Sequence, residues 1–386
     1  MHIPEKKGPE ISIILPCLNE EASIGFCIDK LREIIENHNL DAEVIIVDNG
    51  SIDNSCKIIR QSGPSLKKAK LVHEPRKGYG SAYMKGFEVA QGKYLFMADS
   101  DGSYDFEEIP RFINKLKSGY DFVIGNRFKG KIEEQAMPWH HRYIGNPILS
   151  KVLKLFFKTK VNDAHCGMRA ITKQAYNKLG LKTIGMEFAS EMVIQAGKKH
   201  LRINEVPINY HKRKGTSKLK SFSDGWRHLR FMLLYSPLFL FFIPGLILFL
   251  LGIISMIWIY LGPQEIFGLK FQYHPMFIST ILIITGYQLI FFGIFAKTYA
   301  ITHLGEPEKF NKLYKHITIE RASILGIAII GSGILIYAST LINWLNSTFD
   351  ALNETKKSFI ALTLITLGIQ TIFSSFMLSI LGIKEK

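Results

Sequence analysis

The chain has 386 residues, of which 47% are hydrophobic and 21% are charged. This length predicts at least two structural units, and the charged fraction excludes both a disordered acidic tail and a purely transmembrane bundle. The formal net charge of +15 favours a nucleic acid, an anionic lipid or a phosphorylated substrate as partner. Because the mean hydropathy is nevertheless positive, at +0.11, the charged and apolar residues must be segregated along the chain.

The first half of the chain alternates between strand-like and helix-like segments. Short apolar runs predict five strands, at residues 11–15, 43–47, 70–73, 94–98 and 121–124. Helical periodicity between them predicts helices at residues 22–36, 54–60, 80–90 and 106–116. This alternation is typical of an α/β fold with a mostly parallel sheet. Ligands bind beyond the carboxyl ends of such strands, so functional residues should follow each strand.

The first three strands are each followed by a distinctive string of residues. The strings are Pro16-Cys17-Leu18-Asn19-Glu20, Asp48-Asn49-Gly50-Ser51 and Lys77-Gly78-Tyr79-Gly80. Taken singly, the first two also fit an ordinary helix start and an ordinary turn. The third is not a dinucleotide fingerprint, because that pattern belongs after the first strand. It predicts a basic, glycine-containing helix start that can approach a phosphate.

The fourth strand is followed by Asp99-Ser100-Asp101. Two carboxylates at this spacing repel each other unless a cation neutralises them. An isolated Asp-x-Asp is more often a solvated turn, but its position directly after an apolar strand favours a site for a hard divalent cation, whose shell a nucleotide diphosphate can complete. Arg127 after the fifth strand, and Arg142 further on, are either surface charge or a clamp for a second phosphate.

The second half of the chain predicts a membrane domain. Residues 212–230 contain seven basic residues and one acid, a cluster that favours anionic lipid. Four stretches without charged residues follow, of 34, 26, 28 and 26 residues. Each exceeds the roughly 20 residues needed to cross a bilayer. The expected spans are at about residues 235–261, 275–301, 322–345 and 359–383.

The chain is therefore divided into three parts: an α/β domain (1–210), a basic juxtamembrane segment (211–232) and an all-α transmembrane domain of four helices (233–386). Residues 1–231 carry a net charge of +12 and the remainder +3. This asymmetry predicts a cytoplasmic α/β domain with both termini in the cytoplasm. No signal peptide is expected, and the four cysteines predict free thiols. With the basic residues near the membrane, no nucleic-acid partner is expected.

Taken in order, these motifs resemble those of the family-2 glycosyltransferases. The set also includes Gly125-Asn126-Arg127, Asp163…Arg169 and Gly215-Thr216-Ser217-Lys218. The resemblance covers about residues 10–230 and is closest to the polyprenyl-phosphate sugar synthases of the dolichol-phosphate mannose or glucose type. Some members of that branch have a four-span C-terminal region. The resemblance implies a GT-A type fold for the nucleotide-sugar domain.

The resemblance also implies a role for individual residues. The nucleotide would be bound by Pro16, Leu18, Asn19, Glu20, Asp48, Lys77, Gly78 and Asp99. Asp99 and Asp101 would hold Mg²⁺ or Mn²⁺. The diphosphate or the lipid phosphate would be contacted by Arg127, Arg142, Lys212, Arg213 and Lys218, with Asp101 and Arg127 as catalytic residues.

Three positions depart from the family pattern. Asn49 replaces the second Asp of an Asp-Asp-Gly-Ser string, Ser103 stands where mannose synthases commonly have Gln, and Lys212 replaces an Arg. These departures affect the prediction of which sugar is transferred more than the prediction of the reaction class, so the identity of the sugar stays open.

The expected reaction is inverting transfer of a hexose from a GDP- or UDP-sugar to polyprenyl or dolichyl phosphate. Such an acceptor is already anionic and needs no general base. A processive polysaccharide synthase is a second possibility, although its Gln-x-x-Arg-Trp signature is absent. A non-enzymatic membrane transporter or interaction protein would leave the strand-end acids unexplained. The scarcity of ionisable residues in the spans also favours an anchor over transport.

Overall fold

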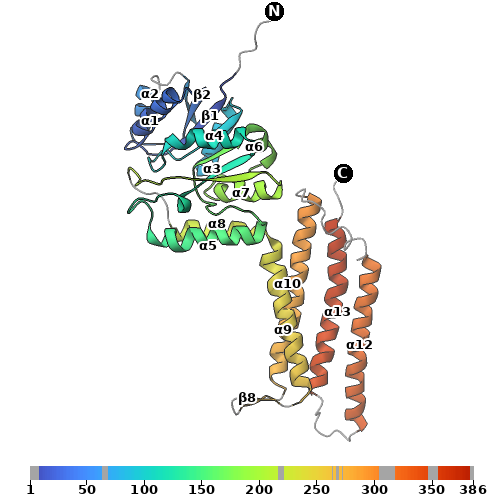
Figure 1. Cartoon of the computed structure of the whole chain (residues 1–386). Helices are drawn as coiled ribbons and strands as arrows, with labels where there is room; N and C mark the ends of the chain where they lie inside the picture. Colours follow the sequence, from blue (N-terminus) through green and yellow to red (C-terminus); the bar gives the residue numbers. More distant parts are fainter. Residues whose placement is uncertain are drawn as a thin grey trace, which may run out of the picture. The chain divides into compact units, whose positions relative to one another are not determined.

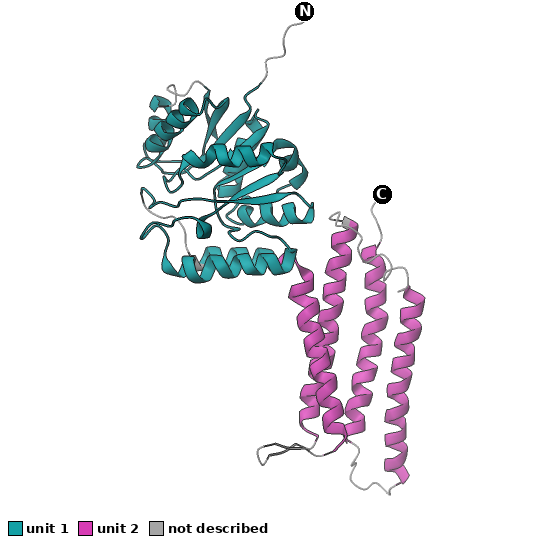
Figure 2. Cartoon of the chain, in the orientation of Figure 1, with its two compact units in different colours: residues 1–232 teal, residues 233–386 magenta. Residues whose placement is uncertain are grey.

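The computed structural model describes residues 8–62, 68–215, 221–262, 264–266, 269–271, 273–303, 318–346 and 355–382. The chain forms two compact units, Met1–Met232 and Leu233–Lys386 (Figure 2). The first unit alternates strands and helices, and the described residues of the second unit form helices and one short pair of strands (Figure 1). The predicted fold class, an α/β domain followed by a helical membrane domain, is therefore confirmed.

A seven-stranded sheet lies at the centre of the first unit, in the order β3-β2-β1-β4-β6-β5-β7. Five strands lie within two residues of their predicted positions: β1 (Ile11–Cys17), β2 (Ala42–Asp48), β3 (Ala69–His73), β4 (Tyr94–Met97) and β5 (Phe122–Asn126). All of β2 and nearly all of β1 are buried. This burial explains their continuous apolar runs, because both faces of a mostly parallel sheet are covered.

Two strands of the sheet were not predicted from the sequence, β6 (Arg169–Thr172) and β7 (Ile203–Pro207). β6 runs antiparallel to both of its neighbours, β4 and β5, whereas β7 is parallel to β5. A charged residue, Arg169, begins β6 and interrupts the apolar signal, yet its side chain is fully buried.

Helices α1 (Ile24–Asn37), α2 (Ser55–Ser62) and α3 (Tyr79–Val89) follow the first three strands, as predicted. The fourth predicted helix begins as a 3-10 turn and continues as α4 (Ile109–Lys117). Further along the chain lie a π-helical turn (His141–Gly145) and four more helices: α5 (Asn146–Phe157), α6 (Lys173–Leu179), α7 (Phe188–Lys198) and α8 (Ser221–Leu234).

Four long apolar helices lie among the residues of the second unit that the structure describes. A π-helical turn (Leu238–Phe242) leads into α9 (Ile243–Tyr260), and the others are α10 (Pro275–His303), α12 (Ile319–Asn346) and α13 (Thr355–Gly382). Strands β8 (Gln264–Ile266) and β9 (Leu269–Phe271) pair between α9 and α10. All four helices are long and apolar enough to cross a membrane, in agreement with the four predicted spans.

Small residues and polar pairs hold these four helices together. A Cβ atom added at Gly368 of α13 would come 2.6 Å from the carbonyl oxygen of Gly326 in α12, so only glycine permits this approach. The hydroxyl groups of Tyr287 and Thr371 lie 2.6 Å apart and join α10 to α13. Both devices are typical of helices that pack within lipid, where hydrophobic burial does not drive association.

Candidate active site

The carboxyl ends of β1, β2 and β4 meet at one edge of the sheet. The register places Cys17 of β1 opposite Asp48 of β2, and Ile14 of β1 opposite Met97 of β4. The strings that follow these strands are therefore neighbours in space. The Ser100 hydroxyl donates to the carbonyl oxygen of Pro16 at 2.5 Å and joins the β4 string to the β1 string.

The Pro16–Glu20 string is tied to the turn that follows β2. Asn19 adopts the left-handed conformation, with φ of +51°, which asparagine tolerates better than most residues. Its side-chain oxygen accepts from the backbone N–H of Ile52 at 2.8 Å, and its own N–H donates to Ser51 Oγ at 2.9 Å. The Asp48 carboxylate accepts from the Ser51 N–H and lies 3.0 Å from His73 Nδ1. The loops after β1 and β2, which contain these nucleotide-binding candidates, are thus joined by hydrogen bonds.

The departure at Asn49 has a structural explanation. The Asn49 side-chain amide donates to the backbone oxygens of Glu74 (2.9 Å) and Arg76 (2.8 Å), and its oxygen accepts from the N–H of Gly78 (2.7 Å). An aspartate could accept the last bond but could not donate the first two. Asn49 therefore holds the Lys77-Gly78 string beside Asp48. Lys77 itself is exposed there.

Asp99 is held by two tyrosines of α3 that the sequence analysis did not select. Its Oδ1 accepts from the hydroxyls of Tyr79 (3.0 Å) and Tyr83 (3.2 Å). Burial, reinforced by the charge of Asp101, raises the pKa of Asp99 to about 6. A Cβ atom at Gly167 would come 2.5 Å from Asp99 Oδ2. The four-residue spacing of the tyrosines, which puts both on one helix face, is the signal that could have identified them.

Asp101 is anchored on one oxygen and faces a cation on the other. Its Oδ1 accepts from the Ser103 N–H (3.0 Å) and hydroxyl (2.5 Å). Its Oδ2 lies 3.5 Å from Nη1 of Arg213, whose Nη2 donates to Glu20 Oε1 at 2.5 Å. Arg213 thus links the β1 string to the β4 string. The structure brings Glu20, Asp101 and Arg213 together.

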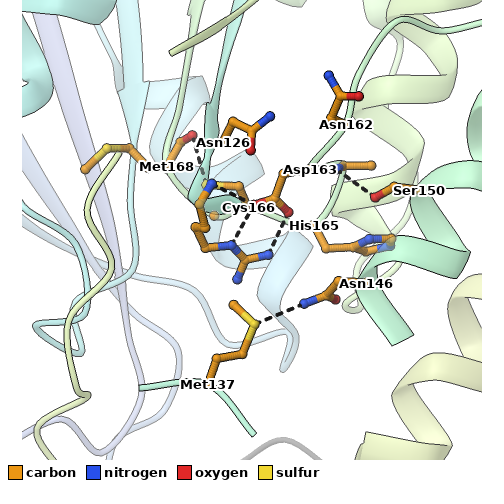
Figure 3. Close-up of polar contacts among 12 residues, drawn as sticks. Asn126, Met137, Asn146, Ser150, Asn162, Asp163, His165, Cys166 and Met168 are labelled. Atoms are coloured by element: carbon orange, nitrogen blue, oxygen red, sulfur yellow. Dashed lines mark hydrogen bonds and ion pairs between the residues drawn. The ribbon is translucent and has the colours of Figure 1, made fainter. Parts of the chain in front are cut away.

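Arg127 has a different set of contacts. Its Nε donates to Asp163 Oδ2 and its Nη2 to Asp163 Oδ1, both at 2.8 Å, and the side chain is only 7% exposed. Glu205 in turn accepts from the backbone N–H groups of Asn162 and Asp163. Figure 3 shows Asp163 on its loop, with Asn126 and Asn162 nearby. The guanidinium is therefore engaged by a buried carboxylate, a structural role that the sequence analysis did not predict.

Two of the other basic residues selected from the sequence, Arg142 and Lys212, have contacts within the described residues. Arg142 is on the π-helical turn, with its guanidinium carbon 5.4 Å from the ring centroid of Tyr143. Lys212 interacts with the side chains of Glu133 and Gln135, through its backbone N–H and its ammonium group respectively. Lys218 lies outside the described residues. Their expected contacts with phosphate stay predictions.

The Asp99 and Asp101 carboxylates suit a hard divalent cation. The tyrosines and Ser103 bind one oxygen of each carboxylate, so the other Oδ2 atoms are the candidate metal ligands. Among the described residues, no group of three or more His, Cys, Asp or Glu side chains could hold a metal ion. Two protein carboxylates are too few to fill the shell of Mg²⁺ or Mn²⁺, so substrate oxygens and water would complete it.

The fold, the strand-end acids and the apolar helices together define a membrane glycosyltransferase. Residues 12–180 match the family described as "Glycosyl transferase family 2". Residues 294–382 match "Glycosyltransferase family 2 C-terminal transmembrane region". The chain is also 36% identical over 377 residues to "Low-salt glycan biosynthesis hexosyltransferase Agl6" of Haloferax volcanii, covering 97% of this chain and 90% of that protein. The chain therefore belongs to glycosyltransferase family 2.

Two further similarities are more distant. The chain is 28% identical over 216 residues to "Dolichyl-phosphate hexose transferase" of Haloferax volcanii, covering 56% of this chain and 89% of that protein. Glucosyl-3-phosphoglycerate synthase of Mycobacterium tuberculosis, solved with Mn²⁺ and UDP, has a TM-score of 0.46 and 20% identity, covering 58% of this chain and 79% of that one. The latter similarity is too low to assign a metal or nucleotide here. Family membership nevertheless favours an enzyme over a non-enzymatic transporter.

Proposed function

We propose that the protein transfers a hexose from GDP- or UDP-hexose to polyprenyl or dolichyl phosphate, with inversion at the anomeric carbon and with Mg²⁺ or Mn²⁺. The proposal of a lipid acceptor rests mainly on an apolar surface of the catalytic unit. Family membership and the dolichyl-phosphate hexose transferase relative support the same reaction.

This apolar surface comprises α5 and the residues before it. The side chains of Trp139, Tyr143, Ile148 and Leu155 are 66%, 68%, 53% and 64% exposed. On the same helix, the polar Ser150 is buried. The helix also buries Leu153, so it has apolar residues on both its buried and its exposed sides, and exposed apolar patches mark interaction surfaces. Aromatic and aliphatic residues on one helix side suit the headgroup region of a bilayer.

The same helix adjoins the active-site loop. The backbone N–H of Ala164 donates to Ser150 Oγ at 3.2 Å, and Ala164 directly follows Asp163 (Figure 3). A lipid surface at α5 would therefore present its phosphate near the loop that carries Asp163. This arrangement is expected of an enzyme whose second substrate enters from the membrane. We place the catalytic unit, and both termini, on the cytoplasmic side on the basis of the charge asymmetry.

In this proposal some residues of the site position the substrates, and others stabilise the negative charge of the phosphates. The Asp48 and Asn19 loops would hold the nucleoside, and the Asp99 and Asp101 carboxylates would hold the cation. The chemistry that the cation supplies is stabilisation of the charge that develops on the departing diphosphate. Arg213 would offset the repulsion between the two anionic substrates. A phosphate oxygen can attack without a protein base, so none is assigned.

A direct assay tests this function. The purified full-length protein is incubated with labelled UDP- and GDP-hexoses and with polyprenyl and dolichyl phosphates, with and without Mn²⁺. The expected product is a metal-dependent, lipid-linked monosaccharide of inverted configuration, resolved by chromatography and NMR. A water-soluble polymer would favour a processive synthase, and a retained anomer would contradict direct displacement.

Changing two residues of the apolar surface should weaken acceptor binding. For the double variant Ile148→Asn, Leu155→Asn we expect the KM for lipid phosphate in vesicles to rise about tenfold, because roughly 1–2 kcal/mol of apolar burial is lost. The KM for the nucleotide sugar should not change. Ile184→Asn, an exposed isoleucine between α6 and α7, is the matched control. A rise of equal size in the control would contradict a specific lipid surface.

Removing one tyrosine hydroxyl should weaken cation binding. Tyr79→Phe deletes one of the two hydrogen bonds that orient Asp99, so we expect the Kd for Mn²⁺, measured by electron paramagnetic resonance, to rise about tenfold. Tyr83→Phe should act in the same direction. Tyr176→Phe changes a partly buried tyrosine of α6 and serves as control. Unchanged Mn²⁺ binding in both α3 variants would contradict the metal assignment of Asp99.

A further inference from the structure

Two histidines, of which His228 is buried and His165 is partly buried, meet through a serine in the catalytic unit. His165 comes from the loop between α5 and β6, His228 from α8, and their ring centroids lie 4.5 Å apart. The Oγ atom of Ser190, in α7, lies 3.3 Å from His165 Nε2 and 2.9 Å from His228 Nδ1. Ser190 is fully buried and His228 is 7% exposed. The proposed reaction uses none of the three.

The surroundings of the two histidines favour neutral imidazoles. Burial lowers the pKa of His165 well below its usual value and that of His228 to about 4; the charge of Arg169 acts in the same direction on both, whereas Asp224 partly opposes it at His228. Each ring then carries one N–H. Because Ser190 has a single O–H, it can donate to only one of the two rings, and its oxygen can accept from the other. The three groups therefore connect α8 to the His165 loop through hydrogen bonds.

His165 lies in the middle of the loop that borders the active site. Two residues before it, Asp163 holds Arg127, and two residues after it, Gly167 packs against Asp99. The backbone N–H of Gly167 donates to the Tyr104 hydroxyl at 2.7 Å. A shift of His165 would therefore be transmitted to both neighbours.

Buried Arg169 makes this loop and the start of α7 one rigid assembly. Its guanidinium donates to the backbone oxygens of Ala164 (2.7 Å), Cys166 (2.8 Å) and Ala189 (2.8 Å). Ala189 directly precedes Ser190, so the loop and Ser190 are fixed relative to each other. His228, in α8, is the one residue of the three that Arg169 does not fix in this way.

The other side of α8 is suited to a membrane surface. Trp226 is 54% exposed, and Arg227 and Arg230 are also exposed, whereas His228 and Phe231 are buried. α8 ends at Leu234, and the first apolar span begins at Leu238. A helix with an aromatic residue and two arginines on one side, directly before a span, binds at the headgroup region.

We propose that His228 is a positioning residue that couples membrane docking of α8 to the active site. Through Ser190 and His165 it holds α8 against the Asp163–Arg169 loop, so that the placement of α8 on lipid sets the position of Gly167 beside Asp99 and of Asp163 beside Arg127. The role of this coupling in catalysis rests on the proposed function, whereas the coupling itself does not.

Hydrogen exchange in the full-length protein, reconstituted in nanodiscs with anionic lipid, tests the coupling directly. In His228→Phe we expect exchange of the backbone amides of residues 164–168 to increase about tenfold, as loss of one buried hydrogen bond implies. His228→Asn, whose amide can take the place of Nδ1, should restore most of the protection. Ser190→Ala should act like His228→Phe. His38→Phe, which changes an exposed histidine, is the control.

Transfer kinetics provide the second measurement. In His228→Phe we expect kcat to fall about tenfold at an unchanged KM for the nucleotide sugar, with recovery in His228→Asn. Equal losses in the Phe and Asn variants, or unchanged exchange at residues 164–168 in both His228→Phe and Ser190→Ala, would overturn the proposal. If the wild-type protein forms no lipid-linked product, the proposed function fails, while the exchange result still decides the coupling.

Discussion

Asp101→Ala is expected to reduce sugar transfer by at least ~10³-fold while leaving the first unit folded, because leaving-group stabilisation contributes about 4 kcal/mol or more to such reactions. Asp101 anchors one carboxylate oxygen on Ser103 and directs the other toward Arg213. Alanine would remove one of the two proposed cation ligands, and it leaves Arg213 its ion pair with Glu20. The measurements are initial rates of lipid-linked product and thermal melting of the purified full-length protein.

A conservative variant and a remote one make this result specific. Asp101→Asn keeps the size and the bonds to Ser103 but loses the charge, so we expect nearly the same loss of activity. Asp29→Asn changes an exposed carboxylate of α1 and should retain full activity. Normal turnover in Asp101→Ala, with Mn²⁺ present, would refute the assignment of Asp101 as metal ligand and catalytic residue.

Asp163→Ala is expected to lower the free energy of unfolding of the first unit by about 3–5 kcal/mol, because it leaves the buried Arg127 guanidinium without its carboxylate. The pair is bidentate, and Asp163 is completely buried. The loss should appear as a large fall in melting temperature, followed by intrinsic fluorescence in detergent. The same variant should lose activity at temperatures above its lowered transition.

The double variant Arg127→Met, Asp163→Leu separates charge from packing. Since it buries no unpaired charge, it should be more stable than Asp163→Ala, although it should lack whatever contact Arg127 makes with phosphate. Glu33→Ala, which removes an exposed ion pair with Lys30, should change stability by less than about 0.5 kcal/mol. An Asp163→Ala protein as stable as the Glu33→Ala control would show that the buried pair is not needed for folding.

The sequence by itself determined the fold class, the first five strands, the four membrane helices and the family. These features depend on local composition or on residue order. The centre of a fully buried strand such as β2 is an apolar run, and an uncharged stretch of 26 or more residues is long enough to cross a bilayer. Asp99 and Asp101 were identifiable because their position after an apolar strand is itself a local signal.

Only the tertiary structure decided what each polar side chain contacts. Arg127 is turned to Asp163, 36 residues away in the sequence, and Asn49 donates to a loop more than 20 residues further on. β6 was missed because its first residue is charged, and that charge is tolerated in the core by three backbone oxygens from two other segments. Such partners are set by packing between distant segments, which leaves no local pattern. For the same reason the cluster of His165, Ser190 and His228 could not be predicted, since its members come from three separate elements.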